Sequence, residues 1–185
     1  MDIKVLYLGL AAAGMAPAQA VIAADYLSVE GAQHTLFPQA DRFSQILISM
    51  TDVQKDSLHA LAGSQPQHGR LQIWEAQRGG LTVGHVFVDE VIGRQDLITY
   101  AIGIDSSGSL TTLEILSYRE SHGGEIRNGN WRAQFEHRAG LDHVRFRTDI
   151  KNITGATLSS EHVTQGVRWL LALWKTVLAG PAVTP

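Results

Sequence analysis

Cysteine is absent from this 185-residue chain, which excludes disulfides, thiolate metal sites and a catalytic thiol. Charge of either sign is also limited. Fifteen basic side chains against 18 acidic ones give a formal net charge of −3. Since proteins that bind nucleic acid carry a basic excess, and this chain does not, we expect no nucleic-acid partner.

The common catalytic motifs are missing as well. The chain has no G-x-S-x-G nucleophile elbow, no P-loop and no Rossmann glycine pattern. Its eight histidines are scattered without ligand spacing. The alternative of a metal set at Glu120, His122 and Glu125 is disfavoured because a Gly-Gly loop scaffolds metal ligands poorly. We therefore expect no metal site and no catalytic residue of a stand-alone enzyme.

The N-terminus is typical of an export signal, which we place at residues 1–24. Lys4 supplies a positive charge, residues 5–13 are apolar, and residues 18–20 have the small-x-small form of a cleavage site. An uncleaved anchor over residues 5–24 is the alternative, although Gly14, Pro17 and Gln19 interrupt it. We expect cleavage near residues 20–24 and a periplasmic location, which suits a chain that has no cysteine to oxidise.

The remaining sequence is sized for a single domain, which we place at residues 25–180, followed by a tail at 181–185. A helix is predicted over residues 28–37, where Pro38 stops it. Thr51 and Gln54 form the capping-box pattern that begins a second helix, which should end at Gly63.

A period of two replaces the helical period from residue 70 onward, which indicates strands. We predict strands over residues 71–77, 81–90, 97–105 and 110–118, joined by glycine-containing turns, and a further alternating strand over 144–150. Turns this short imply antiparallel pairing. The adjacent carboxylates Asp89 and Glu90 face opposite ways in such a strand, so we interpret them as structural.

A long helix over residues 160–178 closes the domain, with an apolar stripe that contains Val163, Val167, Leu170 and Trp174. Trp169 lies off that stripe and is predicted to be exposed. The fold class is therefore α+β: an antiparallel sheet flanked by N-terminal helices and a long C-terminal helix.

Two blocks are candidates for a functional site. The first, T-G-A-T-L-S-S at residues 154–160, is a hydroxyl-rich turn that leads into the last helix. Such a turn is either an ordinary helix cap or a phosphate site, since the first N–H groups of a helix lack internal partners. The second, residues 118–135, contains Gly123-Gly124 and then Trp131 and Phe135 one helical turn apart. By itself this is equally a plain turn and a core tryptophan.

Together, with residues 118–135 preceding residues 154–160 in the chain, the two blocks resemble the FMN-binding domain. That domain occurs in subunits of the sodium-pumping NADH:quinone reductase and the Rnf complex and in related exported flavoproteins. The resemblance implies FMN held covalently by a phosphoester bond to Thr157, made from FAD by a separate flavin transferase. Many members have Asp six residues before that threonine, where this chain has Lys151. The resemblance and the local chemistry together predict these cofactor-binding residues: Tyr118, Glu120, Ser121, His122, Gly123, Gly124, Trp131, Lys151, Thr154, Gly155, Ala156, Thr157, Leu158, Ser159 and Ser160.

The function implied is a periplasmic electron carrier whose partner is a membrane-bound or periplasmic redox protein. Two alternatives stay open. The domain binds FMN or another phosphate-bearing ligand reversibly, in a sensing or assembly role, or it is a flavin-free scaffold because Lys151 prevents modification.

Overall fold

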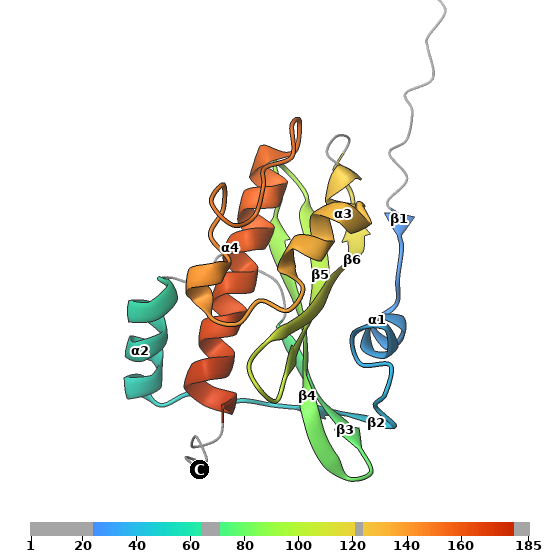
Figure 1. The fold of residues 1–185 in the computed structure, drawn as a ribbon. Coiled ribbons are helices and arrows are strands. Elements are labelled where there is room, and N and C mark those ends of the chain that lie inside the picture. The colour runs from blue at the N-terminus through green and yellow to red at the C-terminus, as the bar shows by residue number, and fades with distance from the viewer. Residues whose placement is uncertain (1–23, 64–70, 121–123, 180–185) are drawn as a thin grey trace, which may run out of the picture.

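The computed structural model describes residues 24–63, 71–120 and 124–179, and the described part is built around one antiparallel sheet (Figure 1). Residues 1–23 of the predicted signal segment, most of the polar loop after Gly63, residues 121–123 and the tail lie outside the described residues. The sheet has the strand order β1-β6-β5-β4-β3-β2. Its strands are β1 (Ala24–Asp25), β2 (Arg42–Ile46), β3 (Gln72–Arg78), β4 (Leu81–Ile92), β5 (Leu97–Asp105) and β6 (Leu110–Tyr118).

The four long strands form where alternation and turn chemistry predicted them. Gly79 and Gly80 have φ values of 57° and 80°, which suits the two-residue turn between β3 and β4. The turn after β5 is fixed by Asp105, whose carboxylate accepts hydrogen bonds from the N–H groups of Ser107 (2.9 Å) and Ser109 (3.0 Å). The bounds of β5 and β6 match the predicted residues 97–105 and 110–118. The predicted α+β class and antiparallel pairing are confirmed.

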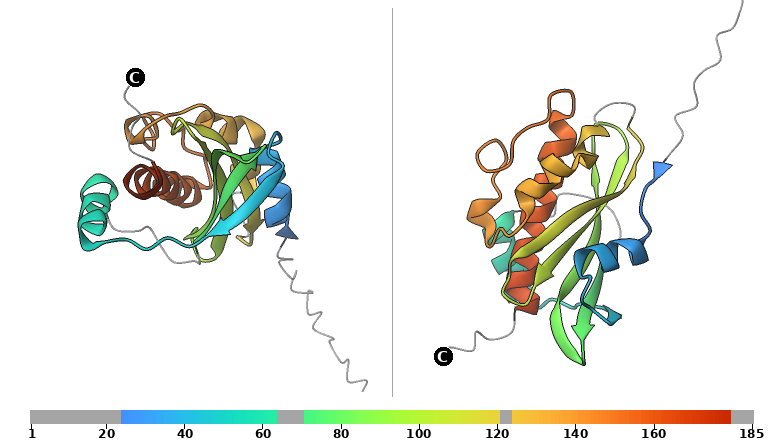
Figure 2. Two further views of the ribbon diagram at one scale, coloured as in Figure 1. Left: turned by 90° about the horizontal axis from the view of Figure 1, so that it is seen from below. Right: turned by 45° about the vertical axis from the view of Figure 1, so that its right-hand side comes forward.

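Helices cover both faces of the sheet, as the view along the layers shows (Figure 2). On one face lie α2 (Asp52–Ala62) and α4 (Thr157–Leu173), and on the other lies α1 (Val29–Leu36). The remaining helical turns are η1 (Gly124–Arg127), α3 (Gly129–Arg132), η2 (Ala133–Phe135), η3 (Leu141–His143) and the π-helical turn η4 (Trp174–Leu178). No helix within the described ranges is both long enough and apolar enough to cross a membrane.

The two N-terminal helices form where they were predicted, and the second begins at its predicted capping box. Ser28 accepts the N–H of Gly31 at 3.0 Å, and Thr51 and Gln54 form the complete capping box. Helix α1 packs so closely that a Cβ at Gly84 would lie 2.5 Å from the ring of Phe37. The buried Phe37 therefore needs glycine on the strand beneath it.

Helix α4 is the central element of its face. It contacts β4 and β5 on one side and α2 and η3 on the other, so apolar residues outside the predicted stripe are buried too. The prediction that Trp169 is exposed is wrong, because only 5% of its surface is accessible. The helix also begins at Thr157, three residues before the predicted start, and its last turn is π-helical.

The prediction of a strand over residues 144–150 is also wrong. Arg145 donates from its backbone N–H and its Nε to Asp149, both at 2.9 Å, and this pulls the segment into a closed loop. Arg147 has φ 64°, which is incompatible with a regular strand. Only Val144 and Ile150 are buried, at the two ends of the loop, so the alternation reflects a loop anchored at its ends.

Candidate functional site

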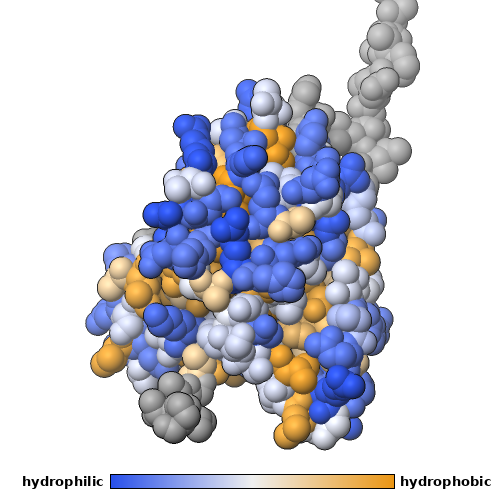
Figure 3. Space-filling view, in the orientation of Figure 1, coloured by the Kyte–Doolittle hydropathy of each residue, from blue (hydrophilic) through white to orange (hydrophobic). Residues whose placement is uncertain are grey.

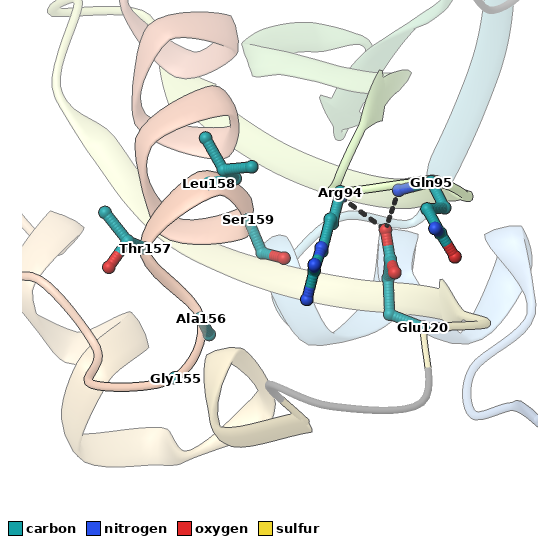
Figure 4. Close-up of a pocket in the computed structure, with 8 residues that line it drawn as sticks. All are labelled: Arg94, Gln95, Glu120, Gly155, Ala156, Thr157, Leu158 and Ser159. Carbon is teal, nitrogen blue, oxygen red and sulfur yellow. Dashed lines mark hydrogen bonds between the residues drawn. The ribbon is translucent and has the colours of Figure 1, made fainter.

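A cavity of about 580 Å³ opens where the turn between β4 and β5, the end of β6 and the start of α4 meet (Figure 4). These segments converge because β4 and β6 run in the same direction, each antiparallel to β5. The upper part of the face shown in Figure 3, where α3 and the first turn of α4 lie, is largely hydrophilic. The residues that line the cavity are Arg94, Gln95, Glu120, Gly155, Ala156, Thr157, Leu158 and Ser159.

The turn before α4 and the first turn of that helix together supply five of these residues. Gly155 has φ 86°, a conformation that glycine adopts without strain. Ala156 occupies the N-cap position, and no side chain caps the helix there. The interpretation of this turn as an ordinary Ser/Thr cap is therefore wrong. Because the helix dipole places partial positive charge at an N-terminus, the uncapped first turn favours an anion.

Thr157 is the first residue of α4 and is half-buried. In Figure 4 its side chain points to the opposite side of the first turn from Arg94. Leu158, which follows it, is 44% exposed, so the helix start is accessible from outside the domain. Thr154 is exposed in the same turn and does not line the cavity.

The two serines of the motif are buried and occupy different environments. The Ser159 hydroxyl lies 3.3 Å from the hydroxyl of Tyr118. Burial raises the pKa of that tyrosine. Ser160 is fully buried, with acceptors at Asn152 Oδ1 (3.3 Å), Ala156 O (2.9 Å) and Thr157 O (3.0 Å). Ser160 therefore holds the turn together and does not line the cavity.

Glu120 organises the opposite wall. Its Oε1 accepts hydrogen bonds from three successive backbone N–H groups, those of Arg94, Gln95 (2.6 Å) and Asp96 (3.0 Å). The resemblance predicted Glu120 as a cofactor-binding residue, and it does line the cavity, but this oxygen is engaged by the protein backbone. Arg94 and Gln95 were not predicted from the sequence. The signal was topological, because the β4–β5 connection must lie at the same end of the sheet as the end of β6.

Trp131 lies behind the site as part of the core. Its indole packs edge-on against Phe135, with ring centroids 5.1 Å apart, and its Nε1–H donates to the carbonyl of Lys151 at 2.9 Å. The N–H of Lys151 donates to Gln134 Oε1 at 2.8 Å. Tyr118, Trp131 and Lys151 are not among the cavity-lining residues. The predicted residues Ser121, His122 and Gly123 lie outside the described residues, and Gly124 begins η1.

Asp89 is buried on the α4 side of β4 and accepts a hydrogen bond from Tyr100 Oη at 3.0 Å, whereas Glu90 pairs with Thr99 across the strands. Burial raises the pKa of Asp89 to about 6. Within the described ranges, no group of three His, Cys, Asp or Glu side chains is arranged to hold a metal ion.

The cavity fits a phosphorylated ligand of cofactor size. Its volume falls in the range of about 300–1,000 Å³ that is usual for small-molecule sites. It joins an uncapped helix start to an arginine side chain, and both favour negative charge. A residue with a hydroxyl that can be esterified, Thr157, stands at its edge. The residues present therefore suit a flavin mononucleotide.

Comparison with known proteins also points to a flavin mononucleotide site. The profile of the family described as the FMN-binding domain matches residues 93–172. The sequence is also 27% identical, over 127 residues, to one subunit of the proton-translocating ferredoxin:NAD(+) oxidoreductase complex of Clostridium ljungdahlii. That alignment covers 63% of this chain and 69% of the relative. The matched range of the family profile contains both walls of the cavity, from Arg94 to the start of α4. Residues 93–172 therefore belong to the FMN-binding domain family.

Proposed function

We propose that this chain is an exported electron-transfer flavoprotein that carries FMN esterified through its phosphate to Thr157. The observation that carries the proposal is the position of Thr157. It begins α4, it borders a cavity large enough for FMN, and its helix has no side-chain cap. The family match over residues 93–172 supports the choice of FMN.

The bond is formed by a flavin transferase that uses FAD. The Thr157 oxygen attacks the flavin-side phosphorus, and the bond from that phosphorus to the bridging oxygen breaks. AMP leaves with the bridging oxygen, and the hydroxyl proton passes to a base of the transferase. No electron is exchanged. The exposure of Leu158 beside a half-buried Thr157 supports access by a second protein.

The first turn of α4 then holds the phosphate. Its N–H groups, which no side chain caps, would donate to phosphate oxygens, and the helix dipole would lower the free energy of the negative charge. When bound, FMN supplies one- and two-electron redox chemistry, and the protein positions it and tunes it electrostatically. A covalent bond suits an exported carrier, since a cofactor that dissociates outside the cytoplasm would not be replaced.

Electrons pass between protein partners in this proposal, because the motifs of a stand-alone enzyme are absent from the sequence. The expected redox partner is a membrane-associated protein. The similarity to a subunit of a ferredoxin:NAD(+) oxidoreductase complex supports that class of partner. The proposal of export rests on the signal pattern of residues 1–24. Mass spectrometry of the protein recovered from the periplasm tests it, and the mature N-terminus should lie between residues 20 and 25.

Co-expression with a flavin transferase tests the attachment. Wild-type protein should show flavin fluorescence that survives denaturing electrophoresis, and Thr157→Ala should not. Thr154→Ala is the matched control, because Thr154 lies in the same turn but outside the cavity lining, and it should keep the label. A label retained by Thr157→Ala would defeat the covalent assignment. A colourless acid pellet with a yellow supernatant would instead indicate the reversible binding module.

A further inference from the structure

We propose that Arg94 makes this site selective for the phosphorylated flavin, and that Glu120 is a positioning residue that acts through Arg94. The inference rests on the proposed function for the identity of the ligand. It assigns the phosphate contact to a residue outside the T-G-A-T motif and gives Glu120 a role other than contact with the flavin.

The turn that carries Arg94 is short and closed. Ile92 and Leu97 pair across β4 and β5, and the Gly93 N–H donates to the carbonyl of Asp96 at 2.8 Å. Only residues 93–96 lie between the two strands, so the Arg94 backbone has little freedom. Its side chain is exposed, and Figure 4 shows it extending between Ser159 and Glu120.

Glu120 fixes this turn from the end of β6. A single carboxylate oxygen accepts the N–H groups of residues 94, 95 and 96, and hydrogen bonds to a charged acceptor are the strong ones. A Cβ at Gly93 would lie 2.6 Å from that oxygen. Gly93 and Glu120 are therefore matched: the glycine leaves the space that the carboxylate fills.

The charge of Arg94 is available to a ligand. The ion pairs among the described residues are Lys55–Asp52, Arg132–Glu114 and Arg145–Asp149, so Arg94 forms none with that part of the chain. Glu120 directs its bonding oxygen at the turn backbone. A guanidinium placed in this way, at the edge of a cavity that also receives a helix N-terminus, is matched to a phosphate, which arginine binds with two parallel hydrogen bonds.

Thr157 is compatible with this arrangement. Its side chain points away from Arg94, but threonine in a helix divides between two χ1 rotamers. Rotation about χ1 and about the ester bonds allows a phosphate on Oγ1 to turn toward the cavity. Riboflavin has the same ring and ribityl chain without the phosphate, so it is the appropriate probe of the contact.

Titration of full-length mature Thr157→Ala protein with FMN and with riboflavin tests the assignment, because no covalent bond can form. Arg94→Gln in that background should lower the affinity for FMN by roughly ten- to a hundredfold and change the affinity for riboflavin less than about twofold. Arg94→Lys should recover part of the loss. Arg119→Gln is the matched control, since it removes a neighbouring exposed charge that does not line the cavity, and it should leave FMN affinity nearly unchanged.

A double-mutant cycle tests Glu120. Glu120→Gln should reduce FMN affinity when Arg94 is present and have no further effect when Arg94 is glutamine. Gly93→Ala, which displaces the carboxylate, should reproduce the loss. The proposal is overturned if Arg94→Gln weakens FMN and riboflavin equally, if the Arg94 and Glu120 effects add, or if the parent protein binds neither ligand. These binding measurements use Thr157→Ala protein, so they can be interpreted even if wild-type protein is never flavinylated. Failure of the covalent assignment is therefore distinguished from failure of the Arg94 assignment.

Discussion

The indole N–H of Trp131 donates a 2.9 Å hydrogen bond to the backbone carbonyl of Lys151, six residues before the first residue of α4. Trp131 belongs to α3 and is buried against Phe135. The bond therefore attaches the loop that leads to Thr157 to the core. The side chain of Lys151 itself is exposed, so this position serves the site through its backbone.

Trp131→Phe should lower the free energy of unfolding by roughly 1–3 kcal/mol, because the Lys151 carbonyl loses its donor and the smaller ring leaves part of the buried indole site empty. Urea denaturation measures the change. Lys151→Ala is the control, since it keeps the carbonyl and alters only an exposed side chain. It should stay within about 0.5 kcal/mol of wild type. Equal losses in the two variants would contradict the assigned role of the indole.

Gly166→Ala should destabilise the domain by roughly 1–3 kcal/mol, because the helix interior has no room for another carbon. A Cβ there would lie 2.2 Å from Tyr100 Oη, and moving Tyr100 would disturb its bond to Asp89. Gly129→Ala is the matched control. A Cβ at Gly129 meets nothing within 4 Å, so the midpoint temperature of thermal unfolding should be unchanged or slightly higher. A Gly166→Ala protein as stable as the control would show that α4 is not packed so closely on β5.

The predicted strands succeeded where two independent signals agreed. In β5 and β6 the period of two runs between turn residues, and both bounds were correct. Alternation alone misled at residues 144–150, where the Arg145–Asp149 bonds close a loop. Trp169 was misjudged because an amphipathic stripe describes one covered face, whereas α4 is covered on two.

The candidate site was predictable where it is local in sequence. Gly155 to Leu158 line the cavity as the T-G-A-T-L-S-S block predicted, although the helix begins three residues earlier than expected. Of the opposite wall, Glu120 was predicted but Arg94 and Gln95 were not, because strand pairing and Glu120, more than 20 residues away, bring them to the cavity. Such contacts follow from topology, and no motif in residues 93–96 marks them.

The pH dependence of stability should report on Asp89. Burial raises its pKa from 3.8 to about 6, so the folded protein holds this proton more tightly than the unfolded chain. The stabilising contribution of the protonated group is therefore complete below about pH 4 and is lost as the pH rises to 6 and above. Relative to Asp89→Asn, wild-type protein should lose roughly 2–3 kcal/mol of unfolding free energy between pH 4 and pH 7.

Urea denaturation of both proteins at several pH values in that window measures the difference. Asp149 does not confuse the comparison. Its hydrogen bonds to Arg145 lower its pKa to about 2, and its titration is common to both proteins. If the two stability curves ran parallel from pH 4 to pH 7, Asp89 would not titrate as a buried carboxyl.

The most direct test of the central claim is the mass of one peptide from protein matured beside a flavin transferase. Trypsin cuts after Lys151 and Arg168, and the peptide between them, residues 152–168, contains Thr157 and no other cleavage site. The account predicts that this peptide gains the mass of FMN less one water, and that fragmentation places the addition on Thr157. An unmodified peptide, or an addition placed on Thr154 or Ser159, would contradict it.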